Sequence, residues 1–368
     1  MRFADVTTLG VGGDIDDFVE VETNAELLAA VSQAQSAGLP ILVLGGGSNL
    51  LVGDAGFDGR VIALRTRGID VRISETPSGE NRGTARVRIA AGESWDDIVA
   101  WSVENGFAGI EALSGIPGSV GAAPIQNIGA YGQEVSSVII GVDVYDIVAG
   151  EIRYIPADEL EFAYRDSVFK QGLEAIVLSV DFELADARAT RLSQPIAFDQ
   201  LAGALRVEMG AQVALADVRE AVLQLRRSKG MVLDAQDPDT RSAGSFFVNP
   251  IVTEHFSRSL PADAPRFPVG EAAQDRVLEI GAHVPPLAGP GLVKLSAAWL
   301  IENAGIPRGF SLPGSRAAVS SKHTLALTNR GGASAEEIAG LARYVRSMVQ
   351  SQFGILLQPE PVCIGIEL

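Results

Sequence analysis

The stretch ILVLGGGSNLLV at residues 41–52 joins an apolar run to three successive glycines. Its first part, Ile41–Leu44, predicts a short buried strand that opens directly into a glycine loop. A helix is predicted just before it, over residues 23–37, because Thr23 and Glu26 form a capping-box pattern ahead of an apolar face. Helix, strand and glycine loop in succession predict a small α/β lobe.

A second lobe is predicted after residue 66, and it is richer in strands than in helices. Apolar or alternating runs predict four strands, at Val71–Ile73, Val87–Ile89, Val138–Ile147 and Ala175–Leu184. The first two read as a hairpin with a polar tip at residues 75–83, and residues 94–105 read as a capped helix. Strands separated by few helices predict an α+β fold rather than a regular βαβ wind.

The rest of the chain predicts a third domain. Amphipathic patterns predict helices at Asp217–Lys229, at Lys294–Ala304 and from Ser334 onward, and a short strand is predicted at Ile355–Leu357. The proline-rich stretch Glu254–Pro290 reads as an elaborated, irregular surface loop.

Composition and charge exclude several classes of function. The 368 residues carry a net charge of −17, which argues against nonspecific binding to nucleic acid or to an anionic membrane. No apolar run approaches the roughly 20 residues of a membrane span, and no export signal is visible, which favours the cytoplasm. With Cys363 as the only cysteine, and His255, His283 and His323 far apart, we expect no metal site.

Two glycine-rich loops are candidates for ligand binding. The loop Gly45–Asn49 suits close backbone approach to a phosphate, but it lacks the Lys-Ser/Thr pair of a P-loop and the third glycine of the dinucleotide fingerprint. Its alternative interpretation is a tight turn after a strand. The longer segment GIPGSVGAAPIQNIGAYG, residues 115–132, carries no charged side chain, so its N–H groups are available to a pyrophosphate. A merely flexible loop is the alternative.

Three further segments carry polar groups among apolar ones. In YRDSVFK (residues 164–170), Arg165 reads either as a functional cation or as half of a structural ion pair, and Ser167 with Lys170 matches the S-x-x-K pattern of serine acyl-enzymes. In GSFFVNP (residues 244–250), Ser245 reads either as a reactive hydroxyl or as a buried serine bonded to backbone. In QPEP (residues 358–361), two prolines either preorganise Glu360 or simply end a strand.

Taken together, these segments resemble the UDP-N-acetylenolpyruvoylglucosamine reductase family over nearly the whole chain. GGGSNLLV, the long glycine segment, YRDSVFK, GSFFVNP and QPEP occur in the family's order. The resemblance implies a two-lobed FAD-binding domain of the vanillyl-alcohol-oxidase type and a C-terminal α/β substrate-binding domain. The implied divisions are residues 1–66 and 67–214 for the two FAD-binding lobes, 215–355 for the UDP-sugar domain, and 356–368 for a segment that returns to the active site.

The resemblance also implies FAD as the cofactor, lying across the two glycine loops. No His or Cys occurs in these loops to attach a flavin, so we expect noncovalent FAD. The implied cofactor-binding residues are Gly45, Gly46, Gly47, Ser48, Asn49, Gly115, Ile116, Pro117, Gly118, Ser119, Gly121, Ala122, Asn127, Ile128, Gly129 and Ala130.

The activity implied is the NADPH-dependent reduction of an enolpyruvyl UDP-sugar to UDP-N-acetylmuramate, in the synthesis of peptidoglycan precursors. By match to the family motifs, Arg165 and Glu360 stabilise an enolic intermediate, and Ser245 donates a proton. Glu360 can help an anion only as a protonated donor or through a relay, so the resemblance implies a raised pKa for this carboxyl.

The implied substrate-binding residues lie close to these three in the motifs or along the chain. Tyr164 and Asn249 flank the catalytic positions, and Lys229 matches a family lysine that meets the UDP phosphates. Phe198 stands where related chains with a longer substrate loop carry a tyrosine, so the hydroxyl contact of that tyrosine to the phosphate is absent here.

Three other functions fit part of the sequence. A flavin oxidase or dehydrogenase of the same fold would keep the glycine loops without needing Ser245, Glu360 and Lys229 together. A flavin- or UDP-sugar-binding protein without turnover would not need Arg165 and Ser245. A serine acyltransferase would rest on Ser167 and Lys170 and would carry no flavin.

Overall fold

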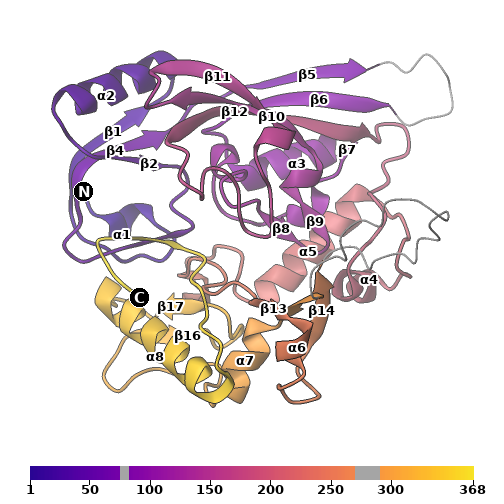
Figure 1. Ribbon diagram of the computed structural model, residues 1–368. Coiled ribbons are helices and arrows are strands. Elements are labelled where there is room, and N and C mark those ends of the chain that lie inside the picture. The colour runs from indigo at the N-terminus through magenta and orange to yellow at the C-terminus, as the bar shows by residue number, and fades with distance from the viewer. Residues whose placement is uncertain (75–82, 270–290) are drawn as a thin grey trace, which may run out of the picture.

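The computed structural model describes residues 1–74, 83–269 and 291–368. In Figure 1 the N-terminal lobe and a broad sheet form the upper part, and the last third of the chain forms the lower part. The lobe contains α1 (Phe3–Val6), α2 (Asn24–Ser36) and the strands β1 (Ile15–Val21), β2 (Ile41–Leu44), β3 (Leu50–Val52) and β4 (Phe57–Leu64). Strands β1, β4 and β2 pair in parallel, in that order.

Local sequence signals account for the position of the first glycine loop. The Thr23 hydroxyl accepts a hydrogen bond from the N–H of Glu26 at 3.2 Å, which caps α2 as the sequence predicts. Leu27 and Val31 are completely buried on the inner face of this helix. Strand β2 pairs with β4 in the sheet of this lobe, and the glycines follow directly at the carboxyl end of β2. The carboxyl ends of the strands are the usual place for a ligand at an α/β sheet.

The second lobe is built on one broad antiparallel sheet with the strand order β11-β10-β12-β6-β5, which Figure 1 shows along the top of the molecule. Its strands are β5 (Ile69–Ser74), β6 (Thr84–Ala90), β10 (Ile139–Asp146), β11 (Glu151–Pro156) and β12 (Ala175–Asp186), with the short β7 (Phe107–Ala108) paired to β12. One face of the sheet packs against α3 (Trp95–Asn105), whose Trp95 ring centre lies 6.1 Å from that of Phe182. Two-residue alternation puts the charged side chains Arg86, Arg88 and Asp181 on the other face, where they form ion pairs.

Helices α4 (Asp199–Leu205) and α5 (Leu215–Ser228) pack on the second lobe rather than on the C-terminal part. Val218 and Val222 of α5 are buried in one cluster with Ala112, which belongs to the short helix η1 (Glu111–Leu113) beside α3. The helix expected to begin the third domain therefore shares its core with the preceding lobe. The domain boundaries drawn from the sequence stay predictions.

The lower part of the molecule combines small sheets with three described helices. Its elements are β13 (Ile251–Thr253), α6 (Glu254–Ser257), β14 (Arg266–Val269), β15 (Leu292–Leu295), α7 (Ala297–Asn303), β16 (Ala317–Val319), β17 (Leu327–Asn329) and α8 (Ala335–Phe353). A full capping box between Ser334 and Glu337 starts α8. Its apolar stripe, Ile338, Leu341 and Val345, is completely buried.

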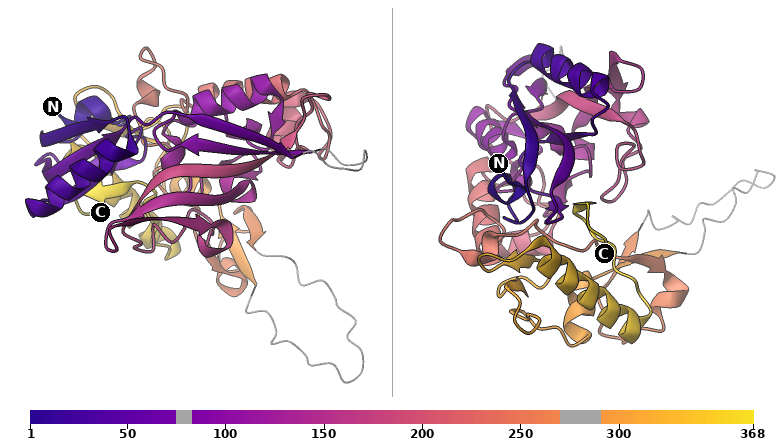
Figure 2. Two further views of the ribbon diagram at one scale, coloured as in Figure 1. Left: turned by 90° about the horizontal axis from the view of Figure 1, so that it is seen from above. Right: turned by 90° about the vertical axis from the view of Figure 1, so that its left-hand side faces the viewer.

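The chain then returns to the N-terminal lobe, as Figure 2 shows in its right-hand view. Residues 358–360 run beside residues 246–248, with the N–H of Glu360 donating to the carbonyl of Phe246 at 2.9 Å. Strand β18 (Val362–Ile364) then pairs in parallel with β3. This path brings Glu360 between the two N-terminal lobes and the C-terminal part.

Several elements differ from those that the sequence predicts. Lys294 lies in β15, and α7 begins only after Ser296, whose hydroxyl caps it by accepting the N–H of Trp299. Within the described ranges, Ile355–Leu357 is not a strand, and the pairing expected there falls on β18 instead. The segment 254–290 begins with α6 and contains β14, so its described part is not irregular.

Two expectations fall on residues that the structure does not describe. The predicted hairpin of β5 and β6 forms, with Val71 opposite Val87, but residues 75–82 of its predicted tip lie outside the described residues. Residues 270–290 of the predicted loop lie outside them as well. None of the helices in the described ranges has the length and apolar character needed to cross a membrane.

Candidate active site

A cavity of about 680 Å³ lies where the two glycine loops meet the C-terminal part. The predicted cofactor-binding residues line it, except Gly115 and Asn127. Arg165, Ser245 and Glu360 line it together, although they lie in three distant parts of the chain. Of the predicted substrate-binding residues, Phe198, Lys229 and Asn249 line it and Tyr164 does not.

Glycine is required in the two loops because their backbones touch. A Cβ atom added to Gly46 would lie 2.6 Å from the Cα of Gly118, and one added to Gly47 would overlap the carbonyl oxygen of Val6. Gly118 itself has φ +131, a conformation that residues with a side chain rarely adopt. The loops therefore form one continuous backbone surface, with Ser48 and Ser119 as small polar side chains.

This surface fits the cofactor that the sequence implies. Exposed backbone N–H groups bind the pyrophosphate of a dinucleotide well, and apolar walls suit a flat ring system. The walls are supplied by Leu64, Trp95 and Ile176 among others. FAD has both of these parts, so the residues present are consistent with it.

The two predicted cofactor residues outside the cavity wall are held by hydrogen bonds, and the N–H of Gly115 donates to a carboxylate oxygen of Asp96 at 2.6 Å. Asn127 accepts the N–H of Ser136 and donates to the carbonyl of Ala163, at 3.1 and 3.0 Å. Its own carbonyl accepts from Arg165 at 3.0 Å. Asn127 therefore ties the second glycine loop to the turn that carries Arg165.

Arg165 is held in one position by its backbone and by three partners. Two hydrogen bonds between Ala163 and Asp166 close a tight turn, in which Arg165 has φ +57. Its guanidinium donates to the carbonyl of Gly129 at 2.6 Å and lies 3.3 Å from a carboxylate oxygen of Glu360. Both partners of this ion pair are mostly buried, so water screens them little.

Glu360 has an environment that favours its neutral form. Burial raises the pKa of its carboxyl, while the charges of Arg165 and Lys170 act in the opposite direction. Asn49 donates to the carbonyl of Glu360 at 3.2 Å and so links this residue to the first glycine loop. The raised pKa implied by the resemblance agrees with this environment.

Ser245 presents a hydroxyl without a partner to the cavity. Its neighbours Phe246 and Phe247 are buried, and their ring centres lie 5.1 Å apart. Within the described part of the chain, the Ser245 hydroxyl makes no hydrogen bond, so it is not a serine bonded to backbone. Its hydrogen is therefore available to a ligand.

Ser167 and Lys170 do not form a nucleophilic pair. Ser167 is completely buried, and its hydroxyl donates to the carbonyl of Ile125 at 2.5 Å. Lys170 lines the cavity instead. The S-x-x-K match is thus explained by local structure, and the acyltransferase interpretation loses its basis.

Another part of the cavity wall combines aromatic rings with a lysine. Phe198 precedes α4, is 42% exposed, and meets the ring of Tyr131 edge-on at 5.8 Å. The amine of Lys229 lies 5.4 Å from the centre of the Tyr131 ring and donates to Gln200 at 2.9 Å. Burial, followed by the charge of Arg226, lowers the pKa of Lys229. These contacts assemble a site for an anion between α4 and α5.

Tyr164 reaches the site through Asn249. The amide of Asn249 donates to the Tyr164 hydroxyl at 3.3 Å and accepts the N–H of Ala297 at 2.9 Å. The amine of Lys294 lies over the same tyrosine ring, 4.6 Å from its centre. Tyr164 therefore holds Asn249 and Lys294 at the start of α7.

His323 is a cavity residue that the sequence did not indicate. Burial, and then the charges of Lys229 and Arg226, lower the pKa of its imidazole to about 4. It is therefore uncharged at neutral pH and can donate or accept a hydrogen bond there.

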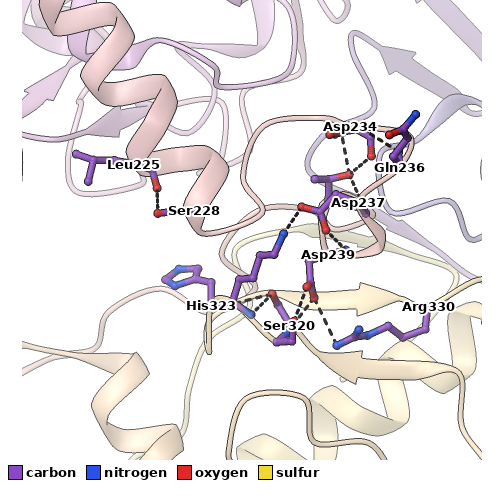
Figure 3. A network of polar contacts seen from close by, with 12 residues as sticks. Leu225, Ser228, Asp234, Gln236, Asp237, Asp239, Ser320, His323 and Arg330 are labelled. Carbon is purple, nitrogen blue, oxygen red and sulfur yellow. Dashed lines mark hydrogen bonds and ion pairs between the residues drawn. The ribbon is translucent and has the colours of Figure 1, made fainter.

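A polar network, drawn in Figure 3, holds the turn that carries His323. The Ser320 hydroxyl accepts the N–H groups of Lys322 and His323, at 3.1 and 3.2 Å. Lys322 pairs with Asp237 at 2.6 Å, and Asp239 accepts the hydroxyl of Ser321 at 2.6 Å. The turn is thereby fixed to the loop that follows α5.

Positively charged side chains gather on the cavity wall, although the protein as a whole is strongly acidic. Arg165, Lys170, Arg226 and Lys229 line it with Glu360 as the only carboxylate among its described lining residues, although the net charge of the chain is −17. The position of Arg226 could be found from the run RRSK at residues 226–229, since residues three apart share a helix face. No local pattern indicated His323 or Gln200.

Two family models match the chain in the order of its parts. The model described as "FAD binding domain" matches residues 15–155, and the C-terminal domain of UDP-N-acetylenolpyruvoylglucosamine reductase matches residues 236–364. With the fold described above, these matches define a flavin-dependent oxidoreductase with a separate C-terminal domain. The fold class predicted from the sequence is confirmed.

Whole-chain relatives define the family more narrowly. The chain is 52% identical to UDP-N-acetylenolpyruvoylglucosamine reductase of Leifsonia xyli subsp. xyli, over 99% of this chain and 98% of the relative. It is 50% identical to the same-named protein of Thermobifida fusca, over 99% and 97% of the two chains. The chain belongs to the UDP-N-acetylenolpyruvoylglucosamine reductase family, as its motifs predicted.

A solved structure agrees with this at the level of the fold. The UDP-N-acetylenolpyruvylglucosamine reductase of Thermus caldophilus superposes with a TM-score of 0.63, at 24% identity, over 99% of this chain and 97% of that one. The likeness extends over both parts of the molecule, the FAD-binding lobes and the C-terminal domain.

Proposed function

We propose that this enzyme reduces the enolpyruvyl ether of UDP-N-acetylglucosamine to UDP-N-acetylmuramate, with NADPH as the reductant, in the synthesis of peptidoglycan precursors. The observation that carries the proposal is that Arg165, Ser245 and Glu360 line one cavity together with the two glycine loops, with Arg165 and Glu360 in contact. A flavin oxidase with another substrate has no need of this combination. Family membership supports the same substrate.

The net reaction adds one hydride and one proton across a carbon–carbon double bond. When bound and reduced by NADPH, FAD would supply the hydride. Its arrival at the terminal vinyl carbon leaves an electron pair that spreads onto the adjacent carboxylate as an enolate. Arg165 stabilises this charge as a cation, and Glu360 does so as a neutral acid that donates a hydrogen bond, which its raised pKa supports.

Ser245 supplies the proton to the neighbouring carbon. Its hydroxyl has no competing partner among the described residues, and the rings of Phe246 and Phe247 restrict access of water from behind. A proton donor that is positioned but not otherwise bonded can turn toward the substrate without breaking an existing hydrogen bond. The serine recovers its proton from solvent through the open cavity.

The cationic side chain of Lys229, which lies over the ring of Tyr131, binds the diphosphate of the substrate. Lys229 lies beside Phe198 and Gln200, and the neutral His323 adds a hydrogen-bond donor without a charge. Asn249, held by Tyr164, binds the sugar. NADPH and the UDP-sugar use the same cavity in turn, and the cytoplasmic location predicted from the sequence suits both ligands.

The test is the visible spectrum of the purified protein followed by NADPH oxidation with and without the enolpyruvyl UDP-sugar. We expect flavin absorbance, and one NADPH consumed per UDP-N-acetylmuramate formed under anaerobic conditions. Rapid NADPH oxidation that needs only oxygen would favour the oxidase alternative. A bound flavin that NADPH and substrate leave unchanged would favour a binding protein without turnover.

A further inference from the structure

Tyr131 stands at the tip of a tight hairpin, in a backbone conformation that a tyrosine seldom adopts. Strand β8 (Gly129–Ala130) pairs with β9 (Gln133–Glu134), which leaves Tyr131 and Gly132 as the two turn residues. Their φ angles are +49 and +86. Two-residue turns with positive φ at both positions favour asparagine or aspartate before glycine, and a bulky residue there is strained. The tyrosine at the first position therefore calls for a reason beyond the turn itself.

The ring of Tyr131 packs against the segment that carries Phe198. The two ring centres lie 5.8 Å apart, and the amine of Lys229 lies 5.4 Å from the centre of the Tyr131 ring. A Cβ atom built on Gly132 would lie 3.2 Å from Ala197, so the backbone of the hairpin tip also contacts this segment. A phenylalanine would make all of these contacts equally well. They therefore leave the hydroxyl of Tyr131 unexplained.

This hydroxyl has no partner in the protein. Tyr131 lines the cavity, and among the described residues no group forms a hydrogen bond with its hydroxyl. Burial raises the pKa of the phenol, while the charge of Arg226 acts in the opposite direction. The hydroxyl is therefore protonated at neutral pH and can donate a hydrogen bond to a ligand.

Two neighbouring cations also lack an anionic partner. Arg226, in the last turn of α5, donates to the carbonyl of Met231 at 2.9 Å, but its Nε is buried without a partner in the described structure. No carboxylate oxygen of the described ranges lies within 4 Å of the charged groups of Arg226 or Lys229. Cations that are poorly solvated and unpaired are costly. Together with the free phenol they suit a ligand that carries two adjacent negative charges.

We propose that Tyr131 binds the diphosphate of the UDP-sugar and that its hydroxyl makes the hydrogen bond that Phe198 cannot make. This inference rests on the proposed function, since it takes the UDP-sugar as the ligand of this part of the cavity. A diphosphate has several acceptor oxygens, so the phenol can donate to one of them while Arg226 and Lys229 supply the positive charge. FAD contains the same chemical group. The contacts of Tyr131 with Phe198 and Lys229 favour the substrate, and the test measures both ligands.

The experiment compares Y131F, F198Y and the double variant Y131F/F198Y as FAD-loaded proteins. Y131F removes only the hydroxyl and keeps the ring. Y344F is the matched control, because Tyr344 stacks on Phe310 away from the described cavity wall and its hydroxyl also has no partner in the described chain. Calorimetry measures the dissociation constant of UDP-N-acetylglucosamine, which carries the same diphosphate and does not react. Gel filtration measures the FAD that each protein retains, and thermal melts measure its stability.

We expect Y131F to weaken the binding of UDP-N-acetylglucosamine about 10- to 100-fold, the loss typical of one hydrogen bond to a charged group. F198Y should improve binding more in the Y131F background than in the wild type, because there it restores the hydrogen bond that is missing. Y344F should bind the UDP-sugar as the wild type does. All four variants should retain FAD and melt close to the wild-type temperature.

Other outcomes overturn the inference. Wild-type affinity in Y131F would mean that the hydroxyl does not contact the diphosphate. An equal gain from F198Y in both backgrounds would mean that the two hydroxyls act independently, so that one does not replace the other. Loss of FAD from Y131F, with unchanged affinity for the UDP-sugar in the protein that stays loaded, would assign the hydroxyl to FAD. Wild-type protein that neither binds UDP-N-acetylglucosamine nor oxidises NADPH with the enolpyruvyl UDP-sugar would refute the proposed function itself, which separates the two failures.

Discussion

Replacing Ser245 by alanine is expected to slow one half of the catalytic cycle and to leave the other half intact. Reduction of the flavin by NADPH needs no proton from this hydroxyl. Reoxidation by the enolpyruvyl UDP-sugar does, and loss of a positioned general acid costs about 10²–10⁴-fold. That loss corresponds to a barrier about 3–5 kcal/mol higher.

The structure predicts that this change is almost free of side effects on folding. The Ser245 hydroxyl makes no hydrogen bond within the described chain and faces the cavity, so its removal leaves no buried group unpaired. We expect the free energy of unfolding to change by no more than about 0.5 kcal/mol. A rate loss of several kcal/mol in the barrier then has a chemical cause.

Ser167→Ala is the matched control. Its hydroxyl is completely buried and donates to the carbonyl of Ile125, so the variant should lose about 1–3 kcal/mol of stability. Both half-reactions should nevertheless keep their wild-type ratio.

Stopped-flow absorbance at the flavin band follows each half-reaction separately, and thermal melts follow stability. If both halves slow equally in Ser245→Ala, the hydroxyl positions the flavin and another group is the acid. If neither slows, Ser245 has no catalytic role.

Three further predictions concern the attachment of FAD, the residue Phe198 and the buried carboxyl of Glu360. Acid denaturation should release all yellow colour into the supernatant, because the glycine loops contain no His or Cys; colour on the precipitate would show a covalent bond. Phe198→Tyr should lower the KM for the UDP-sugar, since a charge-assisted hydrogen bond is worth about 1.5–3 kcal/mol before the cost of ordering the segment; an unchanged or higher KM would contradict the assignment of Phe198 to the position of the family's phosphate-binding tyrosine. Because burial raises the pKa of Glu360 above its ordinary 4.5, its stabilising protonation is complete below that pH and is lost as pH rises through the folded-state pKa. The melting temperature of the wild type relative to Glu360→Gln should therefore fall as pH increases from about 4, and a constant difference between pH 4 and 8 would refute the shift.

Local rules predicted the elements whose signals lie within a few residues of each other. The helix α2 has its cap at Thr23, and α8 has its capping box at Ser334 and Glu337, so both starts could be located from the sequence. The strands of the broad sheet follow from two-residue alternation. The start of α7 was predicted three residues early because Lys294 continues an apolar run that the structure uses as β15.

Long-range pairings could not be predicted by the same rules. The prolines around Glu360 suggested the end of a strand, but the pairing partner of this segment is Phe246–Val248, more than a hundred residues away. Family motifs identified Arg165, Ser245 and Glu360, and physical patterns alone left each of them with a structural alternative. His323 and Gln200 enter the cavity from elements that no local pattern relates to it.

The pairing of β18 with β3 has a consequence for how the enzyme is made. Glu360 and Val362 are synthesised after every other residue of the described cavity wall, yet β18, which begins at Val362, pairs with residues 50–52. A nascent chain on the ribosome can fold its FAD-binding lobes while this segment is still inside the exit tunnel. At that stage both glycine loops have been synthesised, but the cavity lacks the side that Glu360 and Val362 form. A product that terminates before Glu360 therefore lacks this side of the cavity and, under the proposed function, the carboxyl that helps Arg165 to stabilise the enolate.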